Sequence, residues 1–205
     1  METSLVVLGG VYELSDVVEP VRVIAFDSHV VMYDTWWSHK NAWGMARLSG
    51  RYSYYRLTTD YFGRHSRYLR TEALTQNEID VHRPDLPFAL AQHSDLSWYE
   101  AWGGDGFASD LPQGGSSMLD APVVYLIPFG PKNGQKPAVV VKADNGAYFS
   151  ETELLLRAHE VQRPHTGEVR LTRGVGIYRS GIQGKLPSYY VWGSLSRLEG
   201  ACNAV

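Results

Sequence analysis

The chain has 205 residues, of which 44% are hydrophobic and 20% charged, and its formal net charge is −3. This composition excludes a globally disordered protein, and the length suits one well-buried core. A single cysteine, Cys202, excludes an internal disulfide and favours a reducing cytoplasm. The first residues lack the basic start of a secretion signal, and no apolar run approaches the roughly 20 residues of a membrane span. We therefore expect a cytoplasmic protein that does not cross a membrane.

The first half of the chain predicts mainly strands. Val21–Phe26 and Val30–Trp37 are rich in β-branched and aromatic residues. Arg51–Thr58 alternates without a plainly apolar face, which favours an exposed strand with one side open to a partner. Gly63–Leu74 fits either a helix or a strand. Residues 75–78 have the hydroxyl–carboxylate spacing of a capping box, which predicts the start of a short helix.

The second half begins after a glycine-rich segment, residues 103–122, which predicts a mobile loop or a sub-domain boundary. A second capping box at residues 150–153 opens the clearest helix, Glu151–Gln162, which Pro164 ends. The remaining apolar runs predict strands at Val123–Ile127, Ala138–Lys142, Ala147–Phe149, Glu168–Thr172, Gly176–Arg179 and Ser188–Leu195. The predicted fold is a β-rich α+β single domain, residues 1–205. It has an antiparallel sheet, one C-terminal helix and the mobile glycine-rich loop.

Cations and aromatic rings are interleaved between Ser38 and Arg70, where seven cations stand against one acid. Cations pair with phosphates and rings stack on bases, although the same residues are common on half-exposed strands. We hypothesise a non-enzymatic binding protein whose partner is anionic or contains nucleic acid, either a protein or a protein–nucleic-acid complex. The oligomeric state is left open. The candidate ligand-binding residues are Arg47, Arg51, Tyr54, Arg56, Arg64 and Arg67.

A second hypothesis comes from the acidic stretch between Glu72 and Asp120, which contains several large aromatics. Aromatics rimmed by acids suit a protein interface, and such acids can compete with nucleic-acid phosphates for a basic groove. The alternative function is an inhibitor or adaptor of nucleic-acid machinery, of the kind encoded by phages and mobile elements. A solvated acidic loop would give the same pattern. The candidate protein-binding residues are Trp98, Glu100, Trp102, Asp105 and Asp110.

Motifs for catalysis and cofactor binding are missing or incomplete. No serine has the glycine spacing of a nucleophile elbow, and Gly184-Lys185 lacks the rest of a phosphate-binding loop. Asp27-x-His29 and His93-x-Asp95 each place two ligand-type side chains together, whereas a metal site needs about three or four. We therefore assign no catalytic residue, metal ligand or cofactor. A metal-dependent enzyme of unknown class stays open as a second alternative, and a non-enzymatic protein is favoured.

Overall fold

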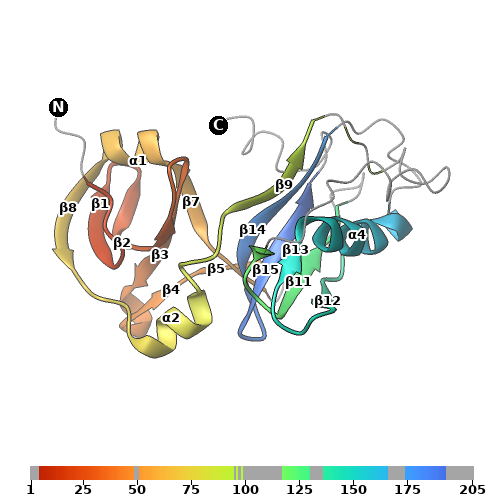
Figure 1. Cartoon of the computed structure of the whole chain (residues 1–205). Coiled ribbons are helices and arrows are strands. Elements are labelled where there is room, and N and C mark those ends of the chain that lie inside the picture. The colour runs from red at the N-terminus through yellow and green to blue at the C-terminus, as the bar shows by residue number, and fades with distance from the viewer. Residues whose placement is uncertain are drawn as a thin grey trace. The chain divides into compact units, whose positions relative to one another are not determined.

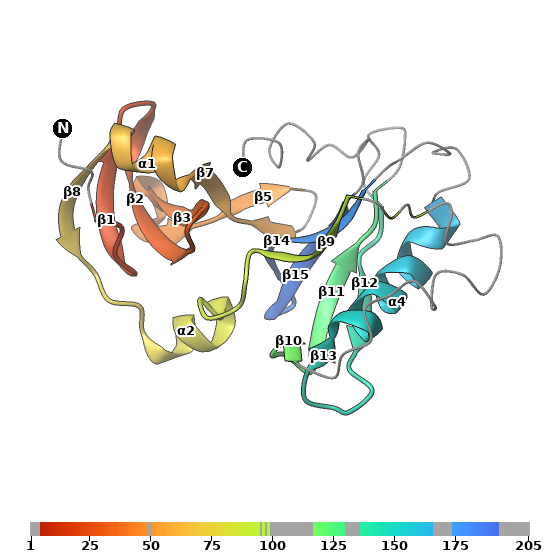
Figure 2. The ribbon, with the colours of Figure 1, turned by 45° about the horizontal axis from the view of Figure 1, so that its top comes forward.

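The computed structural model describes residues 5–48, 51–94, 96, 98, 117–129, 136–165 and 174–192. Contacts along the chain group it into two compact units, one ending at Phe88 and one beginning at Ala89. The described residues are rich in strands, with antiparallel sheets and one C-terminal helix, which confirms the predicted α+β class (Figures 1 and 2). That the whole chain forms a single domain stays a prediction. Among the described residues, no helix is both long and apolar enough to span a membrane.

The first unit is built on a curled antiparallel sheet with the order β4-β3-β2-β1-β8, in which β7 also pairs with β3 (Figure 1). Two further strands, β5 and β6, pair with each other. The strands are β1 (Gly10–Leu14), β2 (Val17–Phe26), β3 (Val30–Trp37), β4 (Ala42–Gly44), β5 (Ala46–Leu48), β6 (Arg51–Ser53), β7 (Tyr55–Thr58) and β8 (Ser66–Thr71). The helices are η1 (Ser38–Lys40), α1 (Thr59–His65) and α2 (Gln76–His82).

Aromatic rings fill the core of the first unit. Alternate residues of β2 face this core, so that Val21 and Val23 are fully buried in it. Helix α1 contributes its one buried residue, Phe62, whose ring lies edge-on to Tyr12 at 5.0 Å between centroids. The cluster consists of Tyr12, Leu14, Val21, Val23, Val31, Tyr33 and Phe62. Short helix α1 is thus attached to the sheet by a single aromatic anchor.

Two segments of the first unit differ from the sequence prediction. Arg51–Thr58 is not one exposed strand: it divides into β6 and β7 at Tyr54, which is only 7% exposed. The Tyr54 hydroxyl lies 3.0 Å from His82 Nδ1, so that a buried polar contact interrupts the strand. Gly63–Leu74 is partly helix and partly strand, because α1 ends at His65 and β8 follows. The helix predicted from residues 75–78 is confirmed, with both hydrogen bonds of the capping box formed.

The second unit contains a sheet with the order β12-β11-β15-β14, and β9 also pairs with β14. The β11–β15 pair is parallel, and the other pairs are antiparallel. Its elements are β9 (Ala89–His93), β10 (Ser117–Leu119), β11 (Val123–Ile127), β12 (Val139–Lys142), β13 (Phe149–Ser150), α4 (Glu151–Gln162), η3 (Arg163–His165), β14 (Val175–Gln183) and β15 (Leu186–Trp192). The predicted bounds of α4 are confirmed.

The predicted glycine-rich loop is shorter than residues 103–122 at its C-terminal end. Ser117–Leu119 forms β10, which pairs with β13. Residues 103–116 of the predicted loop lie outside the described residues, as does the predicted strand Glu168–Thr172. The strand predicted at Ala147–Phe149 begins later, since β13 contains only Phe149 and Ser150.

Helix α4 is attached to the sheet of the second unit by apolar packing and by one buried amide. Ser150 accepts a hydrogen bond from the Glu153 N–H and caps the helix. At the other end the fully buried Gln162 donates to the Phe129 carbonyl and accepts from the Phe129 N–H, both at 2.9 Å. Phe129 follows the end of β11, so this side chain replaces a missing strand partner for its backbone.

Replacing the Gln162 amide should show how much it contributes to the stability of the fold. Gln162→Leu leaves the buried N–H and C=O groups of Phe129 without partners, and we expect the free energy of unfolding to fall by about 2–5 kcal/mol. Urea denaturation followed by circular dichroism measures the change. Gln76→Leu, at an exposed glutamine of α2, is the matched control and should change it by less than about 1 kcal/mol. Equal effects of the two substitutions would contradict the proposed role of Gln162.

Candidate functional site

The candidate ligand-binding residues are distributed over several elements of the first unit. Arg47 lies on β5 and Arg51 on β6, where their backbones face Tyr52 and Leu48, respectively. The other four lie further along the chain: Tyr54 between β6 and β7, Arg56 on β7, Arg64 on α1 and Arg67 on β8. The basic block of the sequence is therefore not one strand or one helix face.

Three arginines at the end of the block are paired with acids. Arg64 forms an ion pair with Asp60 one helical turn earlier, and Arg70 forms one with Glu72. Arg67 donates from Nε to Glu13 Oε2 at 3.0 Å, across the β1–β8 pair. Exposed pairs of this kind contribute little to stability, about 0–1 kcal/mol each. They do cancel charge locally, so this part of the block is far less positive than its sequence indicates.

Two other candidates make contacts inside the first unit. Tyr54 is buried against His82 and cannot stack on a base in this structure. The guanidinium of Arg56 lies 5.9 Å from the centroid of the Phe88 ring, a cation–π contact on a half-buried side chain. The Tyr54 ring is therefore not open to a partner, and the role of Arg56 in binding stays a prediction.

Trp37 and its neighbouring tryptophans make packing contacts within the first unit. The Nζ atom of Lys40 lies 4.3 Å from the centroid of its ring. The backbone of Gly44 packs so closely against the same ring that a Cβ atom there would lie 2.5 Å from it. Trp36 and Trp43, cross-strand partners on β3 and β4, meet edge-on at 5.3 Å. These half-buried rings pack on one another and on glycine, and they stabilise the β3–β4 pair.

Arg47 and Tyr52 form the part of the block that is available to a ligand; we call them the hairpin pair. They are direct cross-strand partners on β5 and β6, which places their side chains on the same face. Arg47 is exposed and Tyr52 is 45% exposed. Among the described residues Arg47 has no acidic partner. Sequence reasoning selected Arg47 as a candidate and missed Tyr52, which lies five residues further along the same block of cations and aromatic rings.

A buried ion network on β2 and β3 was also missed. Arg22 is 4% exposed and Asp34, its cross-strand partner, is 3% exposed. Arg22 Nη2 donates to Asp34 Oδ2 at 2.9 Å and to Glu78 Oε1 of α2 at 2.8 Å. The guanidinium also lies 4.9 Å from the centroid of the Trp43 ring. The sequence signal was a charged residue at the centre of each of two apolar strands.

Two carboxylates share one cation in this network, and their pKa values move in opposite directions. Burial raises the pKa of Asp34 to about 6, although Arg22 acts to lower it. Burial also acts to raise the pKa of Glu78, but hydrogen bonds from the Thr75 N–H and Arg22 outweigh it, so the pKa of Glu78 is lowered. The more deeply buried carboxylate, Asp34, is therefore the one that takes up a proton first.

One candidate residue of the acidic–aromatic hypothesis, Trp98, is not accessible to a partner. Trp98 is completely buried, and its Nε1 donates to the Trp192 carbonyl at 2.6 Å. A side chain in this position does not contact a partner. The other four candidates, Glu100, Trp102, Asp105 and Asp110, lie outside the described residues.

The residue pairs considered for a metal have other roles. Asp27 Oδ1 accepts hydrogen bonds from the His29 and Val30 N–H groups, both at 2.8 Å, and so stabilises the turn between β2 and β3. His93 Nε2 lies 2.9 Å from Glu151 Oε1, while Asp95 is outside the described residues. Within the described part of the chain, no group of three or more His, Cys, Asp or Glu side chains is placed to hold a metal ion.

Comparison with known proteins adds no functional information. No protein-family model, curated protein or solved structure matches the chain. The function therefore has to be inferred from the residues described above.

Asp34→Asn should remove a pH dependence of stability. The folded protein binds the Asp34 proton more tightly than the unfolded chain does, so protonation stabilises the fold below the ordinary pKa of 3.8. This contribution is lost as the pH rises to about 6. Relative to the variant, the unsubstituted protein should lose roughly 2–3 kcal/mol of unfolding free energy over this interval.

Urea denaturation at a series of pH values measures this difference. Asp80→Asn, at an exposed carboxylate of α2, is the matched control and should leave the pH profile of the unsubstituted protein unchanged. If the profiles of the two variants were parallel, Asp34 would not be the group that titrates.

Proposed function

We propose that this chain is a non-enzymatic binding protein of the cytoplasm that engages an anionic partner, nucleic acid in particular, through the hairpin pair. The observation that carries the proposal is the pairing of Arg47 with Tyr52 across β5 and β6. An exposed cation without an acidic neighbour lies beside an exposed ring. Of the residues selected from the sequence, Arg47 is the one whose described surroundings fit this role.

Single-stranded nucleic acid has the chemical groups that this arrangement can bind. Directly opposite residues of an antiparallel pair have their Cβ atoms about 4.5–5.5 Å apart. A guanidinium can pair with a phosphate while the neighbouring ring stacks on a base, and stacking tolerates any base. With so few cations, binding would be weak and sensitive to salt.

The alternative function is an inhibitor or adaptor of nucleic-acid machinery, and fewer of its candidate protein-binding residues remain. Its remaining acidic candidates are untested, and Trp98 is no longer among its contacts because it is buried. No described feature favours it over the hairpin pair. The hairpin pair therefore supplies the function that we put to the test.

Arg47→Ala tests this proposal with a fluorescein-labelled oligodeoxythymidine of about 20 nucleotides as the probe. Fluorescence anisotropy between roughly 25 and 200 mM salt should show weaker binding by the variant, with the slope of log affinity against log salt reduced by about 0.7. Tyr52→Leu should weaken binding roughly fivefold or more without changing that slope, because it removes stacking and no charge.

Arg64→Ala and Arg67→Ala are the matched controls. They remove arginines of the same sequence block whose charges are already paired with Asp60 and Glu13. We expect both to change the salt slope less than Arg47→Ala does. Failure of the unsubstituted protein to bind the probe, or equal slopes for all three variants, would overturn the proposed function.

A further inference from the structure

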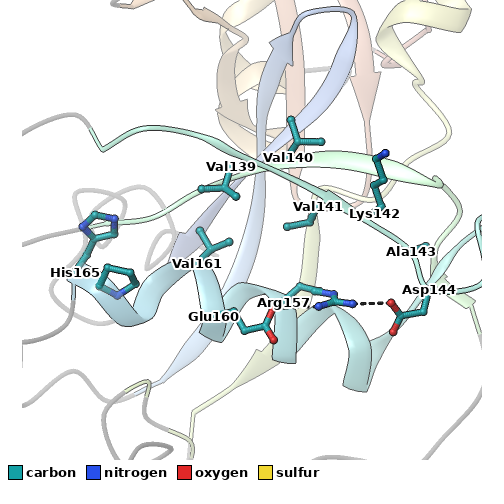
Figure 3. Close-up of a pocket in the computed structure, with 11 residues that line it drawn as sticks. Val139, Val140, Val141, Lys142, Ala143, Asp144, Arg157, Glu160, Val161 and His165 are labelled. Carbon is teal, nitrogen blue, oxygen red and sulfur yellow. Dashed lines mark hydrogen bonds and ion pairs between the residues drawn. The ribbon is translucent and has the colours of Figure 1, made fainter.

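The second unit contains an open groove of about 640 Å³ between β12 and the C-terminal half of α4 (Figure 3). This volume is in the range of sites that hold small ligands or short peptide segments. Figure 3 shows Val141 directed toward α4, whereas Val140 and Lys142 point to the opposite face of the strand. The lining residues are Val139, Val140, Val141, Lys142, Ala143, Asp144, Arg157, Glu160, Val161, Pro164 and His165.

Strand β12 is at the edge of its sheet in the described part of the chain, where it pairs with β11 alone. The Ala143 N–H donates to the Pro122 carbonyl at 2.9 Å, which fixes the alternation of the antiparallel ladder. Val139 and Val141 consequently direct their N–H and C=O groups toward β11. Those of Val140 and Lys142 are directed away from it. The outer edge thus offers hydrogen-bonding groups that an additional strand can satisfy.

The side chains along this edge are unusual for an exposed strand. Val139 is 40% exposed and Val140 is 44% exposed. Edge strands commonly carry charges or proline, which discourage pairing with another chain. On β12 only Lys142, at the end of the strand, has this character. The apolar part of the edge continues into the groove, whose far wall includes Val161 and Pro164 of α4 and η3.

The two cations that line the groove, Lys142 and Arg157, differ in their pairing. Arg157 is paired with Asp144 at 2.6 Å and with Glu160 at 3.1 Å (Figure 3). The other acids of this region, Glu151 and Glu153, bind His93 and the Asp144 N–H, respectively. Lys142 is exposed and has no acidic partner among the described residues. A ligand with a carboxylate near Lys142 would therefore complement the charge.

We propose that this groove binds an extended peptide segment of a partner protein, which adds a strand to the outer edge of β12. The segment places an acidic side chain opposite Lys142 and an aliphatic side chain opposite Val140. The residue between them points to the other face, into the groove against Val161. Backbone hydrogen bonds supply affinity in such a complex, and alternate side chains supply specificity. This site is on the second unit and does not depend on the proposed function of the hairpin pair.

The test uses fluorescein-labelled seven-residue peptides with the full-length chain. One peptide alternates valine and threonine and has a central aspartate, a second has lysine in place of the aspartate, and a third carries N-methyl groups along its backbone. We expect the aspartate peptide to bind about tenfold more tightly than the lysine peptide and the methylated peptide not to bind. Lys142→Glu should reverse the order of the first two peptides.

Lys185→Glu is the matched control, because Lys185 is an exposed lysine of the β14–β15 turn that does not line the groove. It should leave the order unchanged. Failure of Lys142→Glu to reverse the preference would overturn the proposal, as would binding of the methylated peptide. So would a dimer that dissociates on Val140→Lys, because a second copy would then occupy the edge.

Amide hydrogen exchange of the unsubstituted protein provides a measurement that needs no variant. Without peptide, the amides of Val140 and Lys142 should exchange much faster than those of Val139 and Val141. The aspartate peptide should slow the exchange of the first two amides and leave the others unchanged. Unaltered exchange at saturating peptide would contradict strand addition.

Discussion

The burial of one positive charge determines much of the first unit. Arg22 lies in β2 between two core valines but on the opposite face of the strand, where an unpaired guanidinium would cost several kcal/mol. Asp34 supplies one carboxylate from β3, and Glu78 supplies another from α2. Helix α2 buries none of its own side chains. Its attachment to the sheet therefore depends on polar contacts, chiefly that of Glu78 with Arg22 and that of His82 with Tyr54.

Ion pairing also neutralises much of the basic block. Along the sequence, the block is distinguished by its excess of cations, yet Arg67 is paired with an acid from β1 that is far away in the chain. Such pairs reduce the block to a small available region around Arg47. In the described part of the second unit, Arg157 forms ion pairs with two acids, whereas Lys142 forms none. Binding chemistry is then expected at the charges that folding has not neutralised.

Local signals made part of this structure predictable. The bounds of β3, β11 and α4 follow from apolar runs, a capping serine and a terminating proline, all of which act within a few residues. The division of β6 from β7 could not be predicted, because it depends on contact between Tyr54 and His82, which are 28 residues apart. The groove between β12 and α4 could not be predicted from the sequence either. It requires that an edge strand and a helix face each other, and neither segment encodes that relation alone.

The edge strands β8 and β12 differ in the side chains that they expose, and this difference affects what β12 can bind. In the described part of the chain, β8 pairs only with β1, and it exposes two arginines, Arg67 and Arg70, along its length. Those charges make pairing with a foreign strand unfavourable. At the β12 edge the corresponding positions are valines, with Lys142 at one end. Of these two edges, the β12 edge is therefore the one whose side chains permit pairing with another strand. The single lysine there then selects among strands by charge and not by shape alone.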